Sequence, residues 1–577
     1  MTLQLPLSNP GIAYSKTVAH QIAAALKRHD IEFIFGQSLP TMVCLACEEA
    51  GIRQIVYRTE NAGGYMADAY ARVSGKPGIV TAQNGPAAAL LVAPLAEALK
   101  ASIPIIALVQ DVNRDQTDKN AFQDLDHIGL FAPVAKWVRR VTEPSRIEDY
   151  IDQAFVAACS GRPGPVVLLL PADLLIQPAL PTGRRANLGY FPLDRTVAAP
   201  ATLDEAARLI ASALRPIIIV GGGIHTSRAT VELARLQEAA HLPVATTVMG
   251  KGAIDETHAL SIGVLANFLG PNGATRYHRA MIANADVVIL VGTRTNQNGT
   301  DSWQLYPTDA KFIHIDVDGN EIGRNYEAIR LVGDAKLTIS ALTDVLSRHD
   351  LSQHKKNRLA VEASIASAKQ KHLHESKAVR RSGAKPIRPE RIMDELQAQL
   401  TAHDIVVADA SYSSIWIANY LTALKGGMRF LTPRGLAGLG WGFPMALGAR
   451  LAHSGGEVFC VVGDGGFGHV WSELETARRM NIKVILVVIN NGILGFQKHA
   501  ENVKFRTHTT AVHFLPVDHV AIANATGCVG IRVEDPDDLP IVFARARSSE
   551  STILVEVICD PNAFPPITFF TPEEMSS

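Results

Sequence analysis

Cysteine and net charge are both scarce in this sequence. Six cysteines among 577 residues are too few for a disulfide-dense scaffold. Lys and Arg together number 55 and Asp and Glu 56, which gives a formal net charge of −1. No overall basic field is present to attract nucleic acid or an acidic membrane surface. We therefore expect no nucleic-acid partner.

No stretch combines the length and apolarity of a membrane-spanning helix, which needs about 20 mostly apolar residues. The most apolar long segment, 85–109, is interrupted by Pro86, Pro94, Glu97, Lys100 and Pro104. Residues 1–15 carry neither a basic region nor a long apolar core, so no secretory signal is expected there. These features predict a soluble, reduced, cytoplasmic protein with no membrane partner.

One pair of cysteines, Cys44 and Cys47, has the Cys-x-x-Cys spacing. Such pairs serve redox or metal chemistry in some proteins, but a four-thiolate zinc site needs a second pair, and the sequence has none. The interpretation that we favour is two small apolar residues on one helix.

Short β-branched runs alternate with helical patterns throughout, which is typical of open parallel sheets flanked by helices. The first set predicts helices at 19–27, 64–72 and 147–158 and strands at 31–35, 52–57, 78–82, 105–109 and 166–170. The second predicts strands at 217–220, 244–247, 287–291 and 312–316. The third predicts strands at 405–408, 458–462, 484–489 and 553–557.

These sets predict an α/β fold with three doubly wound parallel-sheet domains. Their expected bounds are 14–178, 200–345 and 389–560, followed by a C-terminal tail at 561–577. A Pro-rich linker at about 175–200 joins the first two. A polar, Lys- and His-rich helical connector at about 347–388 precedes the third.

The segment with the most chemical information begins at the strand 458–462. This strand runs directly into Gly463-Asp464-Gly465-Gly466, and after a helix predicted over 470–479 the next strand ends in Asn490-Asn491. Ligands of open parallel sheets lie beyond the carboxyl ends of the strands. Glycines let a phosphate approach the backbone, and a helix N-terminus favours an anion. A carboxylate and an amide oxygen beside a phosphate suit Mg²⁺. Either segment alone could be an ordinary turn.

This pattern resembles the diphosphate and metal motif of thiamine diphosphate-dependent enzymes. The resemblance extends over nearly the whole chain and is closest to the acetolactate synthase-like (acetohydroxyacid synthase) branch of the pyruvate decarboxylase-type family. It implies pyrimidine-binding, central and diphosphate-binding domains in that order. It also implies thiamine diphosphate and Mg²⁺ as cofactors, and homodimers or homotetramers whose active sites lie between subunits.

The resemblance also implies roles for individual residues. Glu60 matches the activating glutamate, whose carboxyl promotes the imino tautomer of the aminopyrimidine. The alternative for Glu60 is a carboxylate at a helix N-terminus. Gln123 matches a glutamine that reaches into the site, with an ordinary loop glutamine as the alternative. The implied cofactor contacts are Glu60, Tyr412, Ser413, Ala437 (through its carbonyl), Leu439 (the wedge that bends the cofactor), Gly463, Asp464, Gly465, Gly466, Asn491, Ile493 and Leu494. The implied metal ligands are Asp464, Asn491 and the backbone carbonyl of Ile493.

Departures from the family pattern concern the substrate pocket and one cofactor loop. Gln37-Ser38 replaces the usual Pro-Gly-Gly turn, and Ser411 stands where glycine is usual. Ala500 takes the place of the tryptophan that selects the acceptor, and we expect Gln497 to point at substrate. The implied pocket residues are Gln37, Ser38, Asn84, Phe122, Gln123, Phe496 and Gln497.

The resulting hypothesis is a thiamine diphosphate-dependent carboligase of the acetolactate synthase type. A 2-oxo acid such as pyruvate would lose CO₂, and the enamine would add to a second carbonyl acceptor. The alternative within the family is a lyase or non-oxidative decarboxylase acting on a 2-hydroxyacyl or 2-oxoacyl substrate. The paired histidines of aldehyde-forming decarboxylases are missing where the resemblance would place them, which disfavours a pure decarboxylase.

One further class of protein, two histidines and one further cofactor are candidates. A non-catalytic protein that kept the fold is disfavoured by Glu60, Asp464 and Asn491. His127 and His499 are candidates for proton transfer, and a surface or loop histidine is the favoured alternative for each. Glycine-rich turns at 221–223, 250–252 and 292–294 resemble a central domain that holds a non-redox FAD in some members, so FAD is a candidate cofactor.

Overall fold

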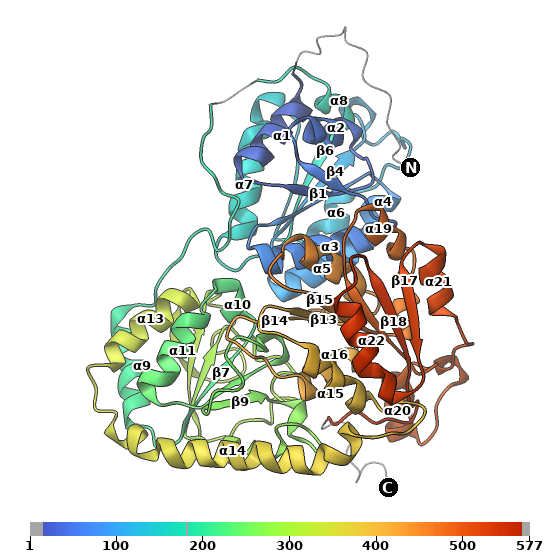
Figure 1. Cartoon of the computed structure of the whole chain (residues 1–577). Coiled ribbons are helices and arrows are strands. Elements are labelled where there is room, and N and C mark those ends of the chain that lie inside the picture. Colours follow the sequence, from blue (N-terminus) through green and yellow to red (C-terminus); the bar gives the residue numbers. More distant parts are fainter. Residues whose placement is uncertain (1–15, 181–182, 568–577) are drawn as a thin grey trace.

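Three open sheets, each of six parallel strands, form the framework of the molecule (Figure 1). The computed structural model describes residues 16–180 and 183–567. Helices flank each sheet, which confirms the predicted α/β class. The start of the first predicted domain (14–15) and most of the predicted tail (568–577) lie outside the described residues.

The sheet of the N-terminal unit has the strand order β2-β1-β3-β4-β6-β5. Its strands are β1 (Phe33–Phe35), β2 (Arg53–Ile55), β3 (Gly78–Ala82), β4 (Ile105–Asp111), β5 (Trp137–Arg140) and β6 (Val166–Pro171). Its helices are α1 (Val18–Arg28), α2 (Thr41–Glu49), α3 (Glu60–Ser74), α4 (Pro86–Leu90), α5 (Val92–Ala101), α6 (His127–Phe131), α7 (Ile147–Cys159) and α8 (Ala172–Leu175).

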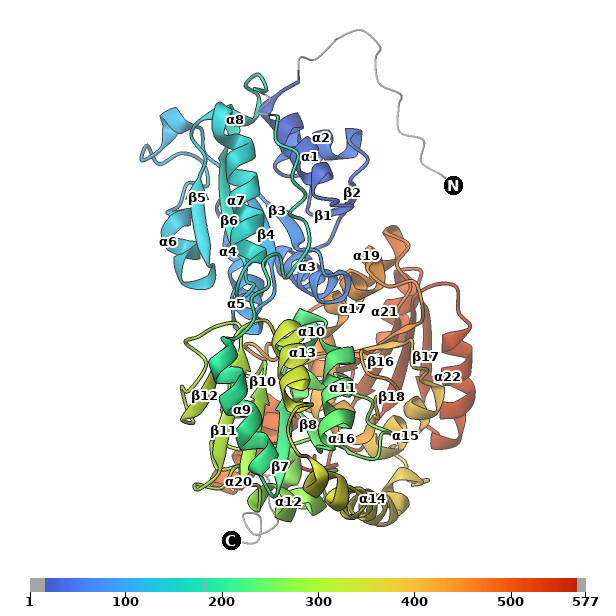
Figure 2. The same cartoon turned by 90° about the vertical axis from the view of Figure 1, so that its left-hand side faces the viewer.

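The sheet of the central unit has the order β12-β11-β10-β7-β8-β9. Its strands are β7 (Pro216–Val220), β8 (Val244–Thr246), β9 (Ser261–Val264), β10 (Val287–Val291), β11 (Lys311–Asp316) and β12 (Ala328–Val332). Its helices are α9 (Pro200–Ser212), α10 (Gly223–Ser227), α11 (Thr230–Ala240), α12 (Arg279–Ala283) and α13 (Ala335–Leu346). The predicted polar connector is the long helix α14 (Ser352–Arg380), which runs along the outside of the central and C-terminal units (Figures 1 and 2).

The sheet of the C-terminal unit has the order β14-β13-β15-β16-β18-β17. Its strands are β13 (Ile405–Ala408), β14 (Arg429–Leu431), β15 (Val458–Gly463), β16 (Ile485–Asn490), β17 (Val529–Val533) and β18 (Ile553–Ile558). Its helices are α15 (Pro389–Gln399), α16 (Tyr412–Tyr420), α17 (Gly442–Leu451), α18 (Asp464–Phe467), α19 (Glu473–Arg479), α20 (Gly495–Phe505), α21 (His519–Ala525) and α22 (Leu539–Arg547).

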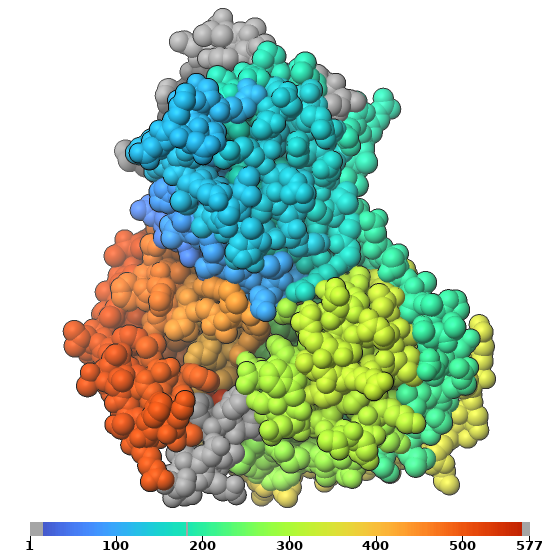
Figure 3. Space-filling model, turned by 180° about the vertical axis from the view of Figure 1, so that it is seen from behind, coloured from blue at the N-terminus to red at the C-terminus, as the bar shows by residue number. Residues whose placement is uncertain are grey.

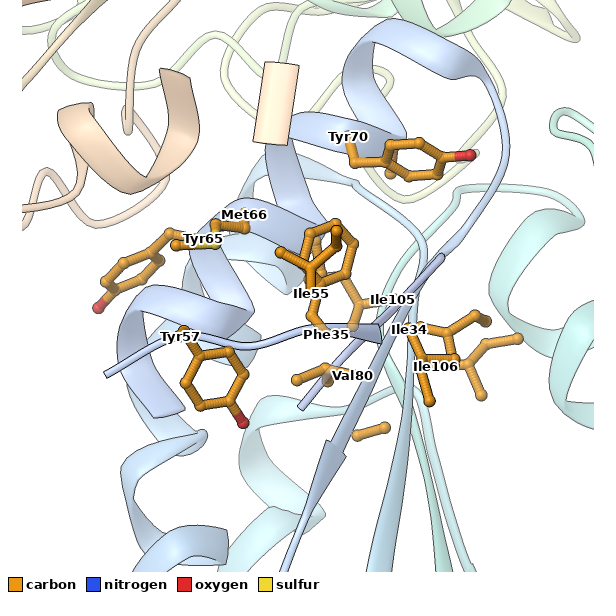
Figure 4. Close-up of a cluster of buried hydrophobic side chains, with 14 of the residues drawn as sticks. Ile34, Phe35, Ile55, Tyr57, Tyr65, Met66, Tyr70, Val80, Ile105 and Ile106 are labelled. Atoms are coloured by element: carbon orange, nitrogen blue, oxygen red, sulfur yellow. The ribbon is translucent and has the colours of Figure 1, made fainter. Parts of the chain in front are cut away.

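The N-terminal unit sits across the other two, which lie side by side (Figures 1 and 3). Its core contains the face of α3 that covers β1 to β4, with Phe35, Tyr57, Met66 and Tyr70 among the buried side chains (Figure 4). The opposite face of α3 packs on α17 of the C-terminal unit. A Cβ added at Gly448 would lie 2.0 Å from the Met66 carbonyl oxygen, so only glycine permits this approach. One continuous apolar core therefore joins the two units.

The predicted secondary structure differs from the structure mainly at the sheet edges. The strands β5, β9, β12, β14 and β17 were not predicted, and all five are edge strands. The helix predicted over 470–479 is present as α19, which begins three residues later, at Glu473, and ends at Arg479. The glycine motif before it forms a separate single turn of helix, α18, as expected for a segment rich in a poor helix former.

Among the described residues, no helix has both the length and the apolarity that crossing a membrane requires.

Candidate active site

A cavity of about 700 Å³ lies mainly between the central and C-terminal units, and a few residues of the N-terminal unit, such as Arg162, line one end of it. Loops at the carboxyl ends of β13, β15 and β16 form its C-terminal wall, where a doubly wound sheet is expected to bind its ligand. The predicted site residues that line it are Tyr412, Ser413, Ala437, Leu439, Gly463, Asp464, Gly465, Gly466, Asn491, Ile493, Leu494, Phe496 and Gln497. The sequence motif and the main cavity therefore coincide.

Asp464 places a buried carboxylate in this cavity. It is 7 % exposed, and burial raises the pKa of its carboxyl group. Its carboxylate accepts a hydrogen bond from the Asn491 backbone N–H at 3.4 Å, and no side chain within residues 16–180 and 183–567 forms an ion pair with it. A buried carboxylate without a cation is costly, which suits an ion as its partner.

The donor set around Asp464 fits a small hard cation. Asn491 and the Ile493 carbonyl belong to the same cavity wall, and the Asn491 side-chain oxygen accepts from the Ile493 N–H at 3.2 Å. No group of three or more His, Cys, Asp or Glu side chains within the described parts of the chain could hold a metal ion. A site made of Asp464, Asn491 and the Ile493 carbonyl would leave the remaining coordination positions to phosphate and water, as Mg²⁺ prefers.

The glycines of the motif serve two different purposes. A Cβ at Gly463 would meet nothing within 4 Å, so that position faces the open cavity. A Cβ at Gly466 would lie only 2.1 Å from Asp409 Oδ2. Gly463 thus leaves room for a ligand, whereas Gly466 leaves room for Asp409.

Asp409 is a site residue that the sequence reasoning missed. Its buried carboxylate accepts from three consecutive backbone N–H groups, those of Gly440 (2.8 Å), Trp441 (3.1 Å) and Gly442 (3.2 Å). It therefore ties the loop that follows Ala437 to the glycine motif. A buried acid directly after an apolar strand was the available signal.

Two positions in the C-terminal wall of the cavity have positive φ angles without being glycine. Ser411 has a φ of 65° and Ala437 a φ of 61°. At Ser411, where the resemblance led us to expect glycine, the backbone has a φ that glycine adopts without strain.

Tyr412 and His499 form a buried pair beside the cavity. The Tyr412 hydroxyl lies 2.5 Å from His499 Nδ1, and the His499 ring stacks on Phe564 at 4.4 Å between ring centroids. Burial lowers the pKa of His499 to about 4 and raises that of Tyr412 well above its usual value. The favoured interpretation of His499 as a surface or loop residue was wrong.

Glu60 begins α3 in the N-terminal unit and does not line the cavity. Its carboxylate forms no hydrogen bond or ion pair with the described residues, so it is available to a ligand. The same unit carries Gln37, whose side-chain amide donates to the Tyr57 carbonyl at 3.3 Å, and the exposed Ser38. The N-terminal candidates Gln37, Ser38, Glu60, Asn84, Phe122 and Gln123 all lie outside the cavity lining. One chain therefore presents two separate halves of the expected site.

Three neighbouring N-terminal candidates have different surroundings. Asn84 is buried, and its side-chain amide donates to the carbonyls of Phe122 (3.2 Å) and Gln123 (3.1 Å). The Gln123 side-chain oxygen is buried without a hydrogen-bond partner. The Phe122 ring is 84 % exposed, so within one chain it lines no pocket.

The predicted substrate contact Gln497 lies at the rim of the cavity, but its side-chain amide donates to Glu501 at 2.8 Å.

Cys44 and Cys47, the pair with the Cys-x-x-Cys spacing, are both free and buried on α2. Burial raises the thiol pKa of Cys44 to about 11 and that of Cys47 to about 12, as expected for core residues.

A buried carboxylate of the N-terminal unit also holds the C-terminal loop. Glu97 Oε1 accepts from the Gly435 N–H at 2.8 Å and Oε2 from the Leu436 N–H at 2.5 Å. Arg72 neutralises it from the other side, with Nη2 3.3 Å from Glu97 Oε1. Sequence reasoning treated Glu97 only as an interruption of an apolar run.

The part of the cavity that the central unit lines, here called its central arm, contains the glycine turns at 221–223 and 292–294 and Arg294. A Cβ at Gly221 or Gly223 would clash with the backbone of Gly292, so chain packing alone explains these two glycines. Arg294 forms no ion pair in the described parts of the chain, and burial lowers the pKa of its guanidinium.

Comparisons with known proteins identify the family. Models of the thiamine pyrophosphate enzymes match in three parts: the N-terminal TPP binding domain over 16–130, the central domain over 203–342 and the C-terminal TPP binding domain over 409–557. The chain therefore belongs to the thiamine pyrophosphate enzyme family and is a thiamine diphosphate-dependent enzyme.

Curated relatives place it near one branch of that family. A "Probable acetolactate synthase large subunit" of Methanococcus aeolicus is 32% identical over 563 residues, covering 94% of this chain and 92% of the relative. Its namesake from Methanocaldococcus jannaschii is 32% identical over 562 residues, with 94% and 92% covered. An "Acetolactate synthase" of Mycobacterium bovis is 32% identical over 561 residues, with 95% and 88% covered. The chain is thus acetolactate synthase-like.

Proposed function

We propose that this protein is a thiamine diphosphate- and Mg²⁺-dependent carboligase. It would decarboxylate a 2-oxo acid such as pyruvate and add the remaining fragment to a second carbonyl compound. The observation that carries the proposal is the buried, uncompensated Asp464 carboxylate beside Asn491 in the main cavity. The names of the relatives support the substrate class.

The chain's own residues would hold and orient the cofactor. Asp464, Asn491 and the Ile493 carbonyl would bind Mg²⁺, and the open side of Gly463 would admit the diphosphate. Tyr412 and Ser413 would donate hydroxyl hydrogen bonds to that anion. The remaining motif residues, Gly465, Gly466 and Leu494, complete the same wall.

At the other end of the cofactor, the Ala437 carbonyl and the Leu439 side chain would fix the pyrimidine and the bend. The free Glu60 carboxyl would hold a proton at a ring nitrogen. Thiamine diphosphate itself supplies the nucleophilic carbon and the electron sink. Gln123 would face the reacting atoms, with its side-chain oxygen free to accept a hydrogen bond from the substrate.

A second copy of the chain would complete the site, because the two halves are separate in one chain. Large apolar side chains are exposed around the N-terminal half at Leu90, Phe122, Leu125 and Ile128. Others surround the cavity side at Leu436, Phe514 and Leu515, the last 86 % exposed. Such patches favour a protein–protein contact, so we propose a homodimer or homotetramer with active sites between subunits.

The decisive experiment combines product identification with two variants. Purified protein with thiamine diphosphate, Mg²⁺ and pyruvate, with and without aldehydes, should give a carboligation product by mass spectrometry. Glu60→Gln and Asp464→Asn should each lose at least about 100-fold in rate, because the first removes the titratable carboxyl and the second the negative charge that the site requires. Glu143→Gln, which changes an exposed carboxylate in the N-terminal unit, is the matched control. Release of free aldehyde without ligation would favour the lyase or decarboxylase alternative.

We also propose FAD as a further cofactor, bound in the central arm of the cavity. The unpaired Arg294 supports an anionic ligand there, whereas the glycines give no separate support. The absorbance of flavin released by denaturing the purified protein decides this point.

A further inference from the structure

Behind Gln123 lies a chain of charged and polar groups that no function above uses. Arg140 Nε lies 2.6 Å from Asp111 Oδ2, and His127 Nδ1 lies 3.4 Å from Asp111 Oδ1. Asp111 is 1 % exposed and His127 is fully buried. The interpretation of His127 as a surface or loop residue was therefore wrong. Figure 2 shows that α6, which begins at His127, lies beside β5, which ends at Arg140.

The other side of the His127 ring holds a backbone turn. The Gly85 N–H donates to His127 Nε2 at 2.9 Å. Because Nε2 accepts this bond, the ring proton of the neutral imidazole is on Nδ1 and faces Asp111. The Arg140 charge and the contact with His127 outweigh the effect of burial and hold the pKa of Asp111 below its usual value. An ionised Asp111 in turn fixes this tautomer of His127.

Gly85 is in direct contact with Gln123. Gly85 has a φ of 64°, and a Cβ there would lie 2.8 Å from Gln123 Cβ and 2.9 Å from the Gln123 carbonyl oxygen. From the adjacent position, Asn84 binds that same carbonyl at 3.1 Å. Gln123 itself has a φ of 61°, a conformation that a non-glycine residue keeps only when its surroundings impose it. Asn84 and Gly85 supply that constraint.

We propose that His127 is a positioning residue for Gln123, held in place by Asp111 and Arg140 and acting through the Gly85 turn. We call this set of groups, from Arg140 through Asp111 and His127 to Gly85, the clamp. It fixes the backbone at Gln123 and leaves the Gln123 side-chain oxygen without a partner, free for a ligand. Asn84 belongs to this clamp, since its amide is fully used by two carbonyls. The proposal rests on the proposed function, in which Gln123 acts on the reacting atoms.

The test is a double-mutant cycle between His127 and Gln123. His127→Leu removes the acceptor for Gly85 and should lower kcat by about 10- to 100-fold, the loss typical of a misplacement of about 1 Å. Thiamine diphosphate affinity should stay within a factor of about two. His127→Gln retains an acceptor and should recover most of the rate. In a Gln123→Ala background, His127→Leu should have no further effect.

Two additional variants keep the test decisive. If His127→Leu does not fold, Arg140→Met removes only the outer brace, and its smaller loss should vanish in the Gln123→Ala background. His354→Leu is the matched control: His354 is also buried, lies on α14 and is bonded to the Ala213 carbonyl at 3.0 Å. It should leave kcat unchanged. Unchanged kcat in folded His127→Leu, or an equal loss with and without Gln123, overturns the proposal.

Hydrogen exchange followed by mass spectrometry separates this inference from the proposed function. His127→Leu should speed amide exchange in peptides covering 84–90 and 120–126, whereas His354→Leu should not. If the wild-type protein formed no product from any 2-oxo acid, the proposed function would fail while the exchange data still showed whether His127 holds the turn. Unchanged exchange in both peptides refutes the clamp whatever the activity.

Discussion

Two glycines of the Asp464 motif, Gly463 and Gly466, have different neighbours, so the same substitution at each can separate the packing of the motif from its contact with a ligand. Gly463→Ala and Gly466→Ala each add a single methyl group, and neither residue has a positive φ. Backbone strain therefore does not distinguish them. The added Cβ meets nothing within 4 Å at Gly463 but lies 2.1 Å from Asp409 Oδ2 at Gly466.

The expected magnitude follows from the bonds that Asp409 makes. Ordinary van der Waals contact begins at about 3.4 Å, so in Gly466→Ala the carboxylate must move by roughly 1 Å. A hydrogen bond of 2.8 Å to the Gly440 N–H does not survive such a shift. A bond to a charged group contributes about 1.5–3 kcal/mol. With about 2–4 °C per kcal/mol for a domain of this size, the melting temperature should fall by on the order of 5–10 °C.

Thermal unfolding without and with thiamine diphosphate and Mg²⁺ is the assay. Gly466→Ala should melt lower under both conditions. Gly463→Ala should melt like the wild type without ligand but lose most of the stabilisation that the ligand gives, because its methyl group occupies the approach to the diphosphate. A weakening of the Kd by about tenfold, or 1.4 kcal/mol, is expected. Equal melting temperatures for the two ligand-free variants would refute the reasoning.

Three other predictions follow from the same structure. Ser411→Gly should raise the unfolding free energy by about 1 kcal/mol, measured by denaturant titration, since it removes a strained φ of 65°; an unchanged midpoint contradicts this. Bonds from His519, Arg532 and Asn490 outweigh burial and lower the pKa of Glu556 to about 2, below the 4.5 of a free side chain. The stability advantage of wild type over Glu556→Gln should therefore be full above pH 4.5, on the order of 3 kcal/mol, and decline as the pH falls towards 2; a pH-independent difference argues against it. All six cysteines are buried, so a thiol reagent should modify none in the native protein at pH 8 and six after denaturation; rapid labelling of Cys44 or Cys47 would count against their core placement.

Prediction from the sequence succeeded for every inner strand and for the edge strand β2, and failed for the other five edge strands. Inner strands such as β10 (Val287–Val291) are apolar on both faces because helices cover both, and this produces an uninterrupted signal. The missed edge strands β5, β12, β14 and β17 each contain arginine, and β9 contains Ser261 and Gly263. These segments are strands because they pair with an inner neighbour, and their own residue types do not indicate that pairing.

The candidate site divides along the same line. Asp464 and Asn491 were accessible to sequence reasoning because a strand end, a glycine turn and the next strand end are local features. The arrangement of Asp111, His127 and Gly85 was not, since these residues come from three separate segments and meet only after folding. The separation of Glu60 from the cavity is likewise a property of the assembled units.

The two bonds from Glu97 to the backbone of Gly435 and Leu436 limit how freely the units can be recombined. The conformation of the loop at Gly435 and Leu436 thus depends on the Glu97 side chain, more than three hundred residues earlier in the sequence. A chimaera that takes its first unit from a relative must bring an acid at that position together with its arginine, or the loop loses two acceptors at once. Although the molecule has three α/β units, the first and the third depend on each other and must be exchanged together.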